Sequence, residues 1–481
     1  MAASRYGRRR NLRHRRVAEV PPRYQTQQIS GPGQQLSLFD AATNGVKNGG
    51  ALRDPAFSEN KSLPVHRWVP WIAGFSATFV DAVCTEYLPP RARNRTAIVL
   101  DPFAGVGTTL FQAVLRGHDA LGFEINPYPA LAASTKLRAF AISLKELDLT
   151  IERMQRAAKS WHRVTPPKTI APPAFKTRIP FFSPRIEPQV LHALAFISGI
   201  SDKSIADLFR TAFGSIMVGV SNYTYEPSLG SRPGAGKPLV EDADVAAVLL
   251  LKLRQMRADI AWLQEEVKRI PHVGRGTVIV EDFLAGNDQE KAASVDLMVT
   301  SPPYMNNYHY VRNTRPQLYW LSFISSPEQQ RGLEFGNFGK FWQTVRDADE
   351  LPLALEHRGL EGVLKQLRDT RRSAGAYGGP GWANYVTAYF NDCDRFMGAL
   401  KRLMRRNGVG VIVVGNSIIQ GMEIKVDEIL GEIASHHGFH VEGIPRIRDK
   451  RVGASITGSS VRRGVRNNAT LYESAVIVRK V

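Results

Sequence analysis

A Ser-Pro-Pro-Tyr corner at residues 301–304 follows a hydrophobic run at residues 297–300. The Ser301 hydroxyl and the Pro302 carbonyl can both accept hydrogen bonds from an amine. The two prolines hold φ near about −65°, and the residue before each of them is extended. Tyr304 adds an aromatic face for stacking. This combination suits an exocyclic amino group on a flat base, although the corner taken alone also fits a structural turn.

A glycine-rich loop at residues 101–109 is the second feature that could do chemistry. It follows a short apolar run that predicts a buried parallel strand, and a helix is expected over 108–116. Gly105 and Gly107 let the backbone approach a ligand closely. Asp101 opens the loop with a carboxylate, which suits a cationic ligand such as a sulfonium. Glu124 ends the next predicted strand, at a spacing from which a carboxylate can reach both hydroxyls of a ribose.

The same loop argues against two other nucleotide-binding motifs. Leu110 stands where a dinucleotide fingerprint has its third small residue, so a nicotinamide dehydrogenase is disfavoured. No lysine follows the glycines, so a phosphate-cradling P-loop is disfavoured too. An ordinary strand–turn–helix without a ligand is the remaining alternative for the loop by itself.

Together, the two features resemble the S-adenosylmethionine-dependent DNA amino-methyltransferases of the Ser-Pro-Pro-Tyr type, which modify cytosine N4. The resemblance spans residues 62–140 and 275–481. It implies S-adenosylmethionine as the cofactor and a catalytic segment made of Ser301, Pro302, Pro303 and Tyr304. The cofactor-binding residues that it implies are Asp101, Phe103, Ala104, Gly105, Gly107, Thr108, Glu124, Ile125, Asp282 and Phe283.

The order of apolar runs along the chain predicts an α/β fold. Strands are expected near residues 96–101, 119–124, 276–281, 296–300, 409–415, 439–445 and 473–480, and further helices over 62–88, 384–406 and 423–437. The resemblance implies a Rossmann-like methyltransferase sheet, mostly parallel with an antiparallel last strand. The predicted methyltransferase core is 61–140 and 276–481, and two largely helical inserts interrupt it at 141–275 and 305–383. Both inserts are candidates for reading DNA sequence, and the choice between them stays open.

The chain of 481 residues carries a formal net charge of +19, which fits a polyanionic partner such as double-stranded DNA. Acid-poor stretches at residues 1–16 and 446–466 hold much of this excess. The candidate DNA-binding residues are Arg446, Arg448, Lys450, Arg451, Arg462 and Arg463. Only Cys84 and Cys393 occur, so neither a disulfide framework nor a cysteine-based zinc site is expected, and no metal is implied.

Residues 1–60 are polar and rich in Arg, Gln and Gly, which predicts a disordered basic tail. Within it, the apolar island Gln35-Leu36-Ser37-Leu38-Phe39 resembles the peptide by which bacterial proteins bind the replication sliding clamp. Its candidate contacts are Gln35, Leu36, Leu38 and Phe39, because apolar anchors on a mobile tail suit capture by a pocket. The alternative is that the island folds back onto its own domain.

The resulting hypothesis is a site-specific DNA methyltransferase that flips a base out of the duplex and methylates its exocyclic amine. Serine at position 301 favours cytosine N4 over adenine N6, where such enzymes usually have Asp or Asn. The alternatives are an adenine-N6 DNA methyltransferase, then an RNA guanine-N2 methyltransferase or a non-catalytic DNA-binding protein. Carbon-5 methylation is disfavoured because neither Cys84 nor Cys393 follows a proline.

The sequence gives no sign of a membrane span or a secretory signal, because no apolar run is long enough and the N-terminus is Arg-rich. The resemblance implies a cytoplasmic, nucleoid-associated protein of bacteria or phage, as in restriction–modification. No pattern in the sequence indicates the recognised DNA site, the oligomeric state or a restriction partner.

Overall fold

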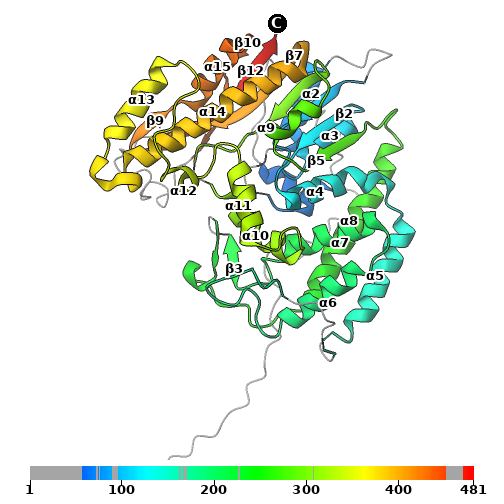
Figure 1. Ribbon diagram of the computed structural model, residues 1–481. Helices are drawn as coiled ribbons and strands as arrows, with labels where there is room; N and C mark the ends of the chain where they lie inside the picture. The colour runs from blue at the N-terminus through cyan, green and yellow to red at the C-terminus, as the bar shows by residue number, and fades with distance from the viewer. Residues whose placement is uncertain are drawn as a thin grey trace, which may run out of the picture.

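The structure is a computed structural model that describes residues 57–71, 74, 76–88, 96–161, 164–165, 171–225, 228–306, 308–450 and 470–481. A central sheet carries helices on its faces, and a second group of helices lies below it (Figure 1). Some predicted contacts fall outside the described residues, namely the clamp-binding Gln35, Leu36, Leu38 and Phe39 and the DNA-binding Arg451, Arg462 and Arg463.

The central sheet has eight strands in the order β10-β12-β7-β6-β1-β2-β5, and β11 also pairs with β12. Its strands are β1 (Ile98–Asp101), β2 (Asp119–Phe123), β5 (Gly276–Ile279), β6 (Val295–Thr300), β7 (Met404–Gly415), β10 (Phe439–Gly443), β11 (Arg446–Lys450) and β12 (Leu471–Lys480). Strands β1, β2, β5, β6 and β7 are parallel, whereas β12 runs antiparallel to both β7 and β10. The predicted α/β fold with an antiparallel last strand is therefore confirmed.

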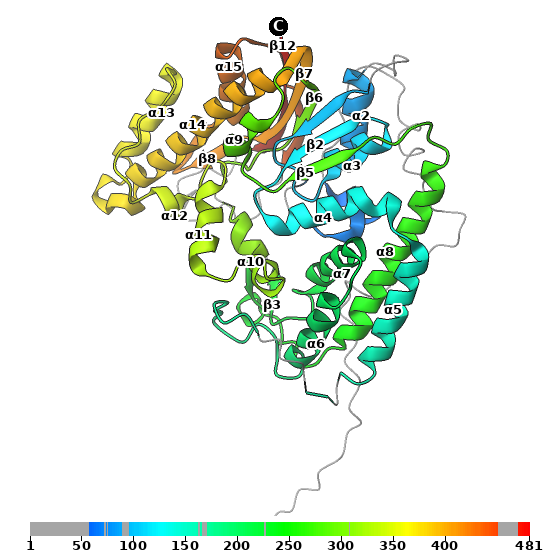
Figure 2. The ribbon, with the colours of Figure 1, turned by 45° about the vertical axis from the view of Figure 1, so that its right-hand side comes forward.

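Helices cover this sheet on both faces (Figure 2). They are α2 (Ala77–Tyr87), α3 (Thr108–Leu115), α4 (Pro127–Arg138), α9 (Phe283–Gly286), α14 (Gly379–Leu403) and α15 (Val426–His436). The helix predicted over 384–406 thus begins earlier, at Gly379, and ends at Leu403. Strand β7 then begins at once rather than at residue 409, because its ladder with β6 starts at the Val295–Met404 pair.

Side chains of β7 show how the sheet is buried on both faces. Ile412 and Val414 join the apolar cluster that contains α14, whereas Val411 and Val413 join the cluster that contains α2 and α3. Successive side chains of a strand point to opposite faces, so burial on both faces requires an unbroken apolar run. Each such side chain contributes about 1.5–3 kcal/mol when it is fully buried. That requirement is why the run at residues 409–415 predicted this strand correctly.

The segment before the sheet is not the single helix predicted over residues 62–88. It contains two short 3₁₀ helices, η1 (Phe57–Lys61) and η2 (His66–Trp68), and α2 is the α-helix found among its described residues. Pro70 explains the break, because a proline disfavours helical geometry in the residue before it, and Val69 has φ −124° and ψ 120°.

Helix η1 occupies the end of the tail predicted for residues 1–60, so that prediction is wrong at residues 57–60. The side chain of Asn60 is fully buried, and its Oδ1 accepts a hydrogen bond from the Ala77 amide at 2.9 Å. This bond ties η1 to the first turn of α2.

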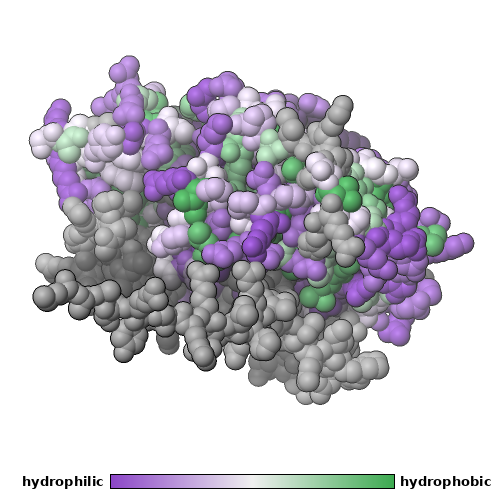
Figure 3. Space-filling model, turned by 90° about the horizontal axis from the view of Figure 1, so that it is seen from below, coloured by the Kyte–Doolittle hydropathy of each residue, from purple (hydrophilic) through white to green (hydrophobic). Residues whose placement is uncertain are grey.

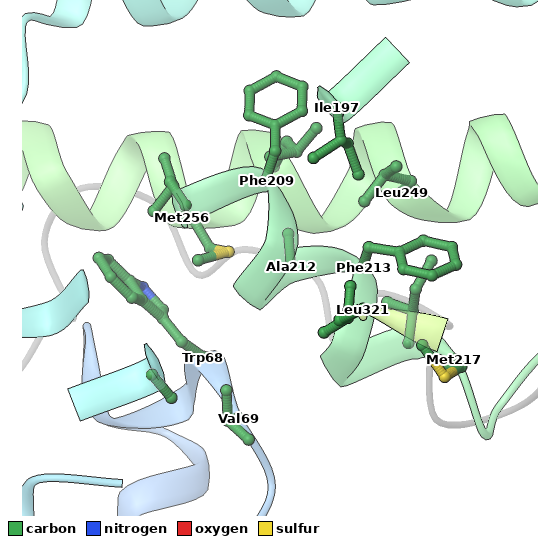
Figure 4. Close-up of a cluster of buried hydrophobic side chains, with 14 of the residues drawn as sticks. Trp68, Val69, Ile197, Phe209, Ala212, Phe213, Met217, Leu249, Met256 and Leu321 are labelled. Atoms are coloured by element: carbon green, nitrogen blue, oxygen red, sulfur yellow. The ribbon is translucent and has the colours of Figure 1, made fainter. Parts of the chain in front are cut away.

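The first insert forms a helical lobe with its own hydrophobic core. Its elements are α5 (Leu144–Ala158), α6 (Glu187–Ser198), α7 (Lys203–Ile216), the hairpin β3 (Tyr223–Tyr225) and β4 (Leu229–Ser231), η4 (Pro233–Ala235) and α8 (Val245–Val267). Phe209, Phe213 and Leu249 lie at the centre of this core (Figure 4). Trp68 from η2 and Leu321 from the second insert join the same cluster, so segments far apart in the chain close it.

Asp259 on α8 fixes the N-terminal segment to this lobe. Its buried carboxylate accepts hydrogen bonds from the Val65 amide at 3.0 Å, the Trp68 indole at 3.0 Å and Arg67 Nε at 3.1 Å. A buried carboxylate is costly unless it is paired and hydrogen-bonded, so these contacts define one position for the chain. The chain then leads directly to Trp71.

The second insert is divided between two cores. Its elements are α10 (Tyr310–Trp320), α11 (Pro327–Gly336), α12 (Trp342–Val345), α13 (Arg358–Asp369) and η6 (Arg372–Tyr377). Leu318 and Tyr319 of α10 pack in the core of the first insert, whereas Leu360 and Leu364 of α13 pack in the cluster of α14. The second insert is helical, as expected, but its two halves stabilise different parts of the molecule.

Candidate active site

The glycine-rich loop and the Ser-Pro-Pro-Tyr corner begin at neighbouring strand ends. Strands β1 and β6 pair in parallel, with Leu100 opposite Met298. At their carboxyl ends, the Thr300 hydroxyl donates a hydrogen bond to Asp101 Oδ1 at 2.7 Å. The Thr109 hydroxyl donates to the Val299 carbonyl at 3.3 Å. Two segments about 200 residues apart in sequence are thus joined directly, as parallel α/β sheets favour for ligand crevices.

A pocket lies between the two segments and contains about 680 Å³ of empty space, including the space at its open mouth. The predicted site residues that line it are Phe103, Gly105, Glu124, Ile125, Asp282, Phe283, Ser301 and Pro303. The predicted residues that do not line it are Asp101, Ala104, Gly107, Thr108, Pro302 and Tyr304. One crevice therefore holds parts of both predicted motifs.

The two loop glycines have different structural roles. Gly105 has φ +51°, and a Cβ on it would lie 3.1 Å from Trp71 Nε1, at the pocket wall. Gly107 has φ +79°, and a Cβ there would lie 2.7 Å from the Cβ of Ala133 on α4. Gly105 therefore lets the Trp71 indole pack closely on the loop, whereas Gly107 lets α3 start close against α4.

Glu124 presents a fixed carboxylate at the pocket wall. Its Oε2 accepts a hydrogen bond from the Gly105 amide at 2.9 Å, and its Oε1 accepts one from the Asn126 amide at 2.8 Å. Burial raises the pKa of Glu124 to about 7, although these two amides lower it. An ionised carboxylate has about four lone-pair sites, so each oxygen keeps acceptor capacity for a ligand hydroxyl.

Asp101 lies beneath the loop rather than in the pocket. It is 2% exposed, and its Oδ1 accepts hydrogen bonds from the Thr300 hydroxyl and the Phe103 amide. Burial raises the pKa of Asp101 to about 6, and these donors oppose the shift. In this structure Asp101 joins the two motifs, and its predicted contact with the cofactor stays a prediction.

Aromatic rings form the opposite wall of the pocket. Phe103 packs edge-on against Phe283 and Phe338, with ring centroids 6.5 Å and 5.0 Å away. Asp282 begins the short helix α9, and its Oδ1 accepts a hydrogen bond from the Leu284 amide at 3.1 Å. An apolar wall with a carboxylate at its edge fits a planar base that carries an amino group.

The Ser-Pro-Pro-Tyr corner presents Ser301 and Pro303 to the pocket and buries the side chain of Pro302. Ser301 Oγ donates a hydrogen bond to the Tyr304 hydroxyl at 3.4 Å. One edge of the Tyr304 ring packs on Gly415 of β7, where a Cβ would lie 3.4 Å from the ring. Burial and the nearby Glu473 carboxylate raise the pKa of Tyr304 well above its usual value.

Comparison with known proteins adds a family relationship to this geometry. The chain is 23% identical over 459 residues to the type II methyltransferase M.BsoBI of Geobacillus stearothermophilus, with 87% of each chain covered. It is 23% identical over 437 residues to the type II methyltransferase M.AvaI of Anabaena variabilis, with 81% of this chain and 82% of the relative covered. The chain is a relative of type II methyltransferases. A shorter match of 57 residues, 40% identical, covers 12% of this chain and 11% of the type II methyltransferase M.MjaII of Methanocaldococcus jannaschii.

Two other comparisons add little to the methyltransferase relationship. No family model matches the chain. The rRNA methyltransferase aviRa from Streptomyces viridochromogenes aligns with 89% of this chain and 96% of its own, at 11% identity and a TM-score of 0.29. Overall similarity at that level is too weak to assign a fold, so the fold assignment rests on the strand order and direction.

Methyltransferase relatives imply S-adenosylmethionine as the methyl donor, and the residues of this pocket fit it. The Glu124 carboxylate matches the two hydroxyls of a ribose. The wall of Phe103, Phe283 and Phe338 matches an adenine ring. Gly105 and Trp71 line the same pocket beside these groups.

Several residues that line the pocket had little or no sequence signal. Gly336, Asn337 and Phe338 line it from the middle of the second insert, where α11 ends, far in sequence from either motif. Tyr310 also lines it, within the stretch after Tyr304 that was expected near the pocket, and the Tyr304 amide hydrogen-bonds to the Tyr310 hydroxyl. Asn126 could have been expected from its place two residues after Glu124.

The basic strand β11 lies at the same end of the sheet as the pocket. Arg446 stacks over the Tyr472 ring, 3.8 Å from its centroid, and pairs with Asp449 at 3.0 Å. Arg448 lies opposite Glu473 on β12, and Glu473 lies opposite Gly415 at the carboxyl end of β7. Lys450 ends β11 opposite Leu471, so the predicted basic loop leaves and rejoins the sheet beside the active site.

Neither metal nor cysteine chemistry is indicated in the part of the chain that the structure describes. No group of His, Cys, Asp and Glu there has the arrangement of a metal site. Both cysteines are buried, and burial raises the pKa of the Cys84 thiol to about 12. Burial also raises the pKa of Cys393 well above its usual value, so neither thiol is a ready nucleophile.

Proposed function

We propose that the protein is a site-specific DNA methyltransferase that uses S-adenosylmethionine to methylate the exocyclic amine of a flipped base, with cytosine N4 as the preferred target. The observation that carries the proposal is the direct joining of the Glu124 pocket to the Ser301 corner through Asp101 and Thr300. Such a crevice holds a methyl donor and an acceptor side by side, so proximity supplies much of the catalysis.

On the donor side, residues of this chain would bind and orient S-adenosylmethionine. S-adenosylmethionine, when bound, supplies an electrophilic methyl carbon on a sulfonium. Glu124 would accept the ribose hydroxyls, and Asp282 would accept the adenine amine beside the Phe103 and Phe283 rings. Trp71 covers the loop at Gly105. The other predicted cofactor contacts, Ala104, Thr108 and Ile125, shape the loop and the neighbouring wall.

On the acceptor side, the corner prepares a poor nucleophile. The lone pair of a base amine is delocalised into its ring, and acceptors that hold its hydrogens favour a pyramidal nitrogen. The Ser301 hydroxyl and the Pro302 carbonyl provide such acceptors, and the two prolines fix their geometry. Tyr304 would stack on the extruded base. Extrusion is necessary because a base inside the duplex cannot reach the pocket.

DNA binding is supported by charge and by connectivity. Arg446, Arg448 and Lys450 lie on the strand beside the pocket, within a chain of net charge +19. Seen from below, the described surface of the helical side is mostly hydrophilic, with apolar residues only interspersed (Figure 3). Basic residues on a strand beside the active site suit the phosphate backbone of DNA.

The first insert is the better candidate for target recognition. The Tyr225 hydroxyl of its hairpin donates to the Asn313 carbonyl at 2.9 Å, and the Leu229 amide donates to Asn313 Oδ1 at 2.8 Å. Asn313 belongs to α10, whose Tyr310 and Val311 line the pocket. Strands β3 and β4 are therefore hydrogen-bonded to the helix beside which a flipped base would enter.

Two predictions about partners and location remain proposals. Among the described residues, no helix is long and apolar enough to cross a membrane. We propose that the protein is a bacterial enzyme located in the cytoplasm in association with the nucleoid. Binding of the segment Gln35 to Phe39 to a sliding clamp is a proposal that deletion of this segment and measurement of clamp affinity would test.

Sequencing of DNA from cells that express the protein tests the proposed function. The readout should separate N4-methylcytosine from N6-methyladenine, and DNA from cells expressing Ser301→Ala is the control. We expect N4-methylcytosine at one short sequence motif, which Ser301→Ala removes. N6-methyladenine would correct the target base, and DNA without any new modified base would refute the enzyme activity.

A further inference from the structure

Glu473 is a buried carboxylate beside the catalytic corner. It is 6% exposed and lies near the start of β12, between Gly415 of β7 and Arg448 of β11. Because β12 is antiparallel, its start lies at the carboxyl ends of β6 and β7, where Ser301 is also found. Removing a carboxylate from water costs several kcal/mol unless hydrogen bonds or an opposite charge compensate. The burial of Glu473 beside the catalytic corner therefore calls for an explanation.

A chain of hydrogen bonds links this carboxylate to Ser301. The Tyr304 hydroxyl is hydrogen-bonded to the side chains of both Ser301 and Glu473. The Ser301–Tyr304 distance is 3.4 Å, longer than the usual O–H···O distance of about 2.7–2.8 Å. Catalytic hydrogen bonds are often long in free enzymes and shorten when substrate binds.

The chemistry of the carboxylate fixes the direction of this chain. An ionised carboxylate can only accept, so Tyr304 must donate its single hydrogen to Glu473. The Tyr304 oxygen is then available to accept the hydrogen of Ser301. With its own hydrogen committed to Tyr304, Ser301 can meet a substrate amine only as an acceptor. That is the role that the proposed function requires of it.

We propose that Glu473, acting through Tyr304, is a positioning residue that holds Ser301 as a hydrogen-bond acceptor and receives the proton that the amine loses. This inference rests on the proposed function and adds two residues to its mechanism. Tyr304 thereby acts through its hydroxyl as well as through its ring. The partly exposed Arg448, whose Nη1 lies 3.8 Å from Glu473 Oε2, balances the charge of the ionised carboxylate.

The proton balance of the reaction is complete along this chain. The amine nitrogen forms a bond to the methyl carbon with its lone pair, and the electrons of the broken carbon–sulfur bond stay on sulfur. The nitrogen then carries one proton too many for a neutral product. This proton passes to Ser301 as the Ser301 hydrogen passes to Tyr304 and the Tyr304 hydrogen passes to Glu473. The carboxylate becomes a neutral acid and returns its proton to water after turnover.

The test compares Glu473→Gln, Tyr304→Phe and the double variant with the wild-type protein. Glutamine keeps the size of Glu473 but can donate as well as accept, and phenylalanine keeps the ring that would stack on the base. Each single variant should lower the single-turnover methylation rate about 10- to 100-fold at saturating cofactor and DNA. Dissociation constants for cofactor and DNA should stay unchanged, because neither residue lines the cofactor pocket.

The double variant separates one chain from two independent effects. If Tyr304 and Glu473 act in one chain, the double variant is no slower than the slower single variant. Glu442→Gln is the matched control, because Glu442 is also a carboxylate paired with an arginine, Arg479, and lies on β10, which pairs with β12. It should methylate at the wild-type rate.

A spectroscopic measurement tests the hydrogen bonds between Ser301, Tyr304 and Glu473 independently of methylation activity. The ¹³Cζ resonance of Tyr304, assigned by its disappearance in Tyr304→Phe, should shift in Glu473→Gln and not in Glu442→Gln. If Glu473→Gln is too unstable to study, the rate and affinities of Tyr304→Phe decide the question.

Two results would overturn the inference. A third result would instead refute the proposed function, and it can be distinguished from the first two. A Glu473→Gln protein that methylates at the wild-type rate, or losses that multiply in the double variant, shows that the chain does not act. A wild-type protein that neither binds S-adenosylmethionine nor methylates DNA shows instead that the proposed function is wrong.

Discussion

The two halves of the crevice are built in different ways. The cofactor half consists of Phe103, Gly105 and Glu124, which lie in two consecutive strand–loop units and are held mainly by backbone amides. The base half consists of Ser301 and Tyr304. Tyr304 packs on Gly415 of β7 and is hydrogen-bonded to the Glu473 side chain on β12, more than 100 residues later in the chain. The first half is thus a local structure with a readable motif. The second depends on the complete sheet, so the two halves should respond differently to substitution.

Ser301→Ala should have the largest effect and should act on the base half alone. Loss of the acceptor should lower turnover about 100-fold or more, as general acid–base groups typically contribute 10²–10⁴. Cofactor affinity measured by calorimetry should stay at the wild-type value. A variant that methylates DNA at the normal rate would show that Ser301 has no role in the reaction.

Glu124→Ala should act on the cofactor half alone. The variant loses two charge-assisted hydrogen bonds to the ribose, each worth about 1.5–3 kcal/mol, so the cofactor dissociation constant should rise at least about 100-fold. At saturating cofactor, the methylation rate should recover towards that of the wild type. An unchanged dissociation constant would remove Glu124 from the cofactor site.

The raised pKa of Glu124 should make cofactor binding in the cofactor half depend on pH. The ionised form accepts ligand hydroxyls, and burial raises its pKa to about 7, so cofactor affinity should be constant above that pH and fall below it. Between about pH 8 and about pH 6 the dissociation constant should rise about tenfold. Calorimetry on Glu124→Gln, which cannot ionise, should give a weaker affinity with a flatter profile. Asp101 titrates near 6 and would add its own dependence only at the acidic end.

Thr300→Val should have the smallest effect and should reach both halves, because Thr300 joins them. It removes the hydroxyl that donates to the buried Asp101, which should lower the free energy of unfolding by about 1–3 kcal/mol. Thermal unfolding measures this loss. Cofactor affinity and turnover should both decline by modest and similar factors. A variant that weakens only one of them would show that the two loops are not coupled through this bond.

The sequence predicted those parts of the fold that depend on local patterns. The strands at residues 96–101, 296–300 and 409–415 were correct, because burial on both faces demands apolar runs. The helix over 62–88 was wrong, because its apolar residues pack without helical geometry around Pro70. The second insert gave no sign that it would be divided between two cores.

For the candidate site, too, the sequence indicated the residues that belong to local patterns. The residues of the glycine-rich loop and Glu124 were found from spacing within one strand–helix–strand unit. Phe338 and Glu473 could not be found in this way, because only the folded sheet brings them to the pocket and to Tyr304. Asp101 was predicted to contact the cofactor. In the structure its buried carboxylate accepts a hydrogen bond from Thr300, almost 200 residues away in sequence, which no local pattern could indicate.

The most direct test of the account is mass spectrometry of nucleosides from DNA methylated in vitro by the wild-type protein and by Ser301→Ala. The account predicts N4-methylcytosine with the wild-type protein and a strong reduction with Ser301→Ala, although both proteins bind S-adenosylmethionine equally well. Methylation at carbon 5, or the same yield of methylated amine from both proteins, would contradict it.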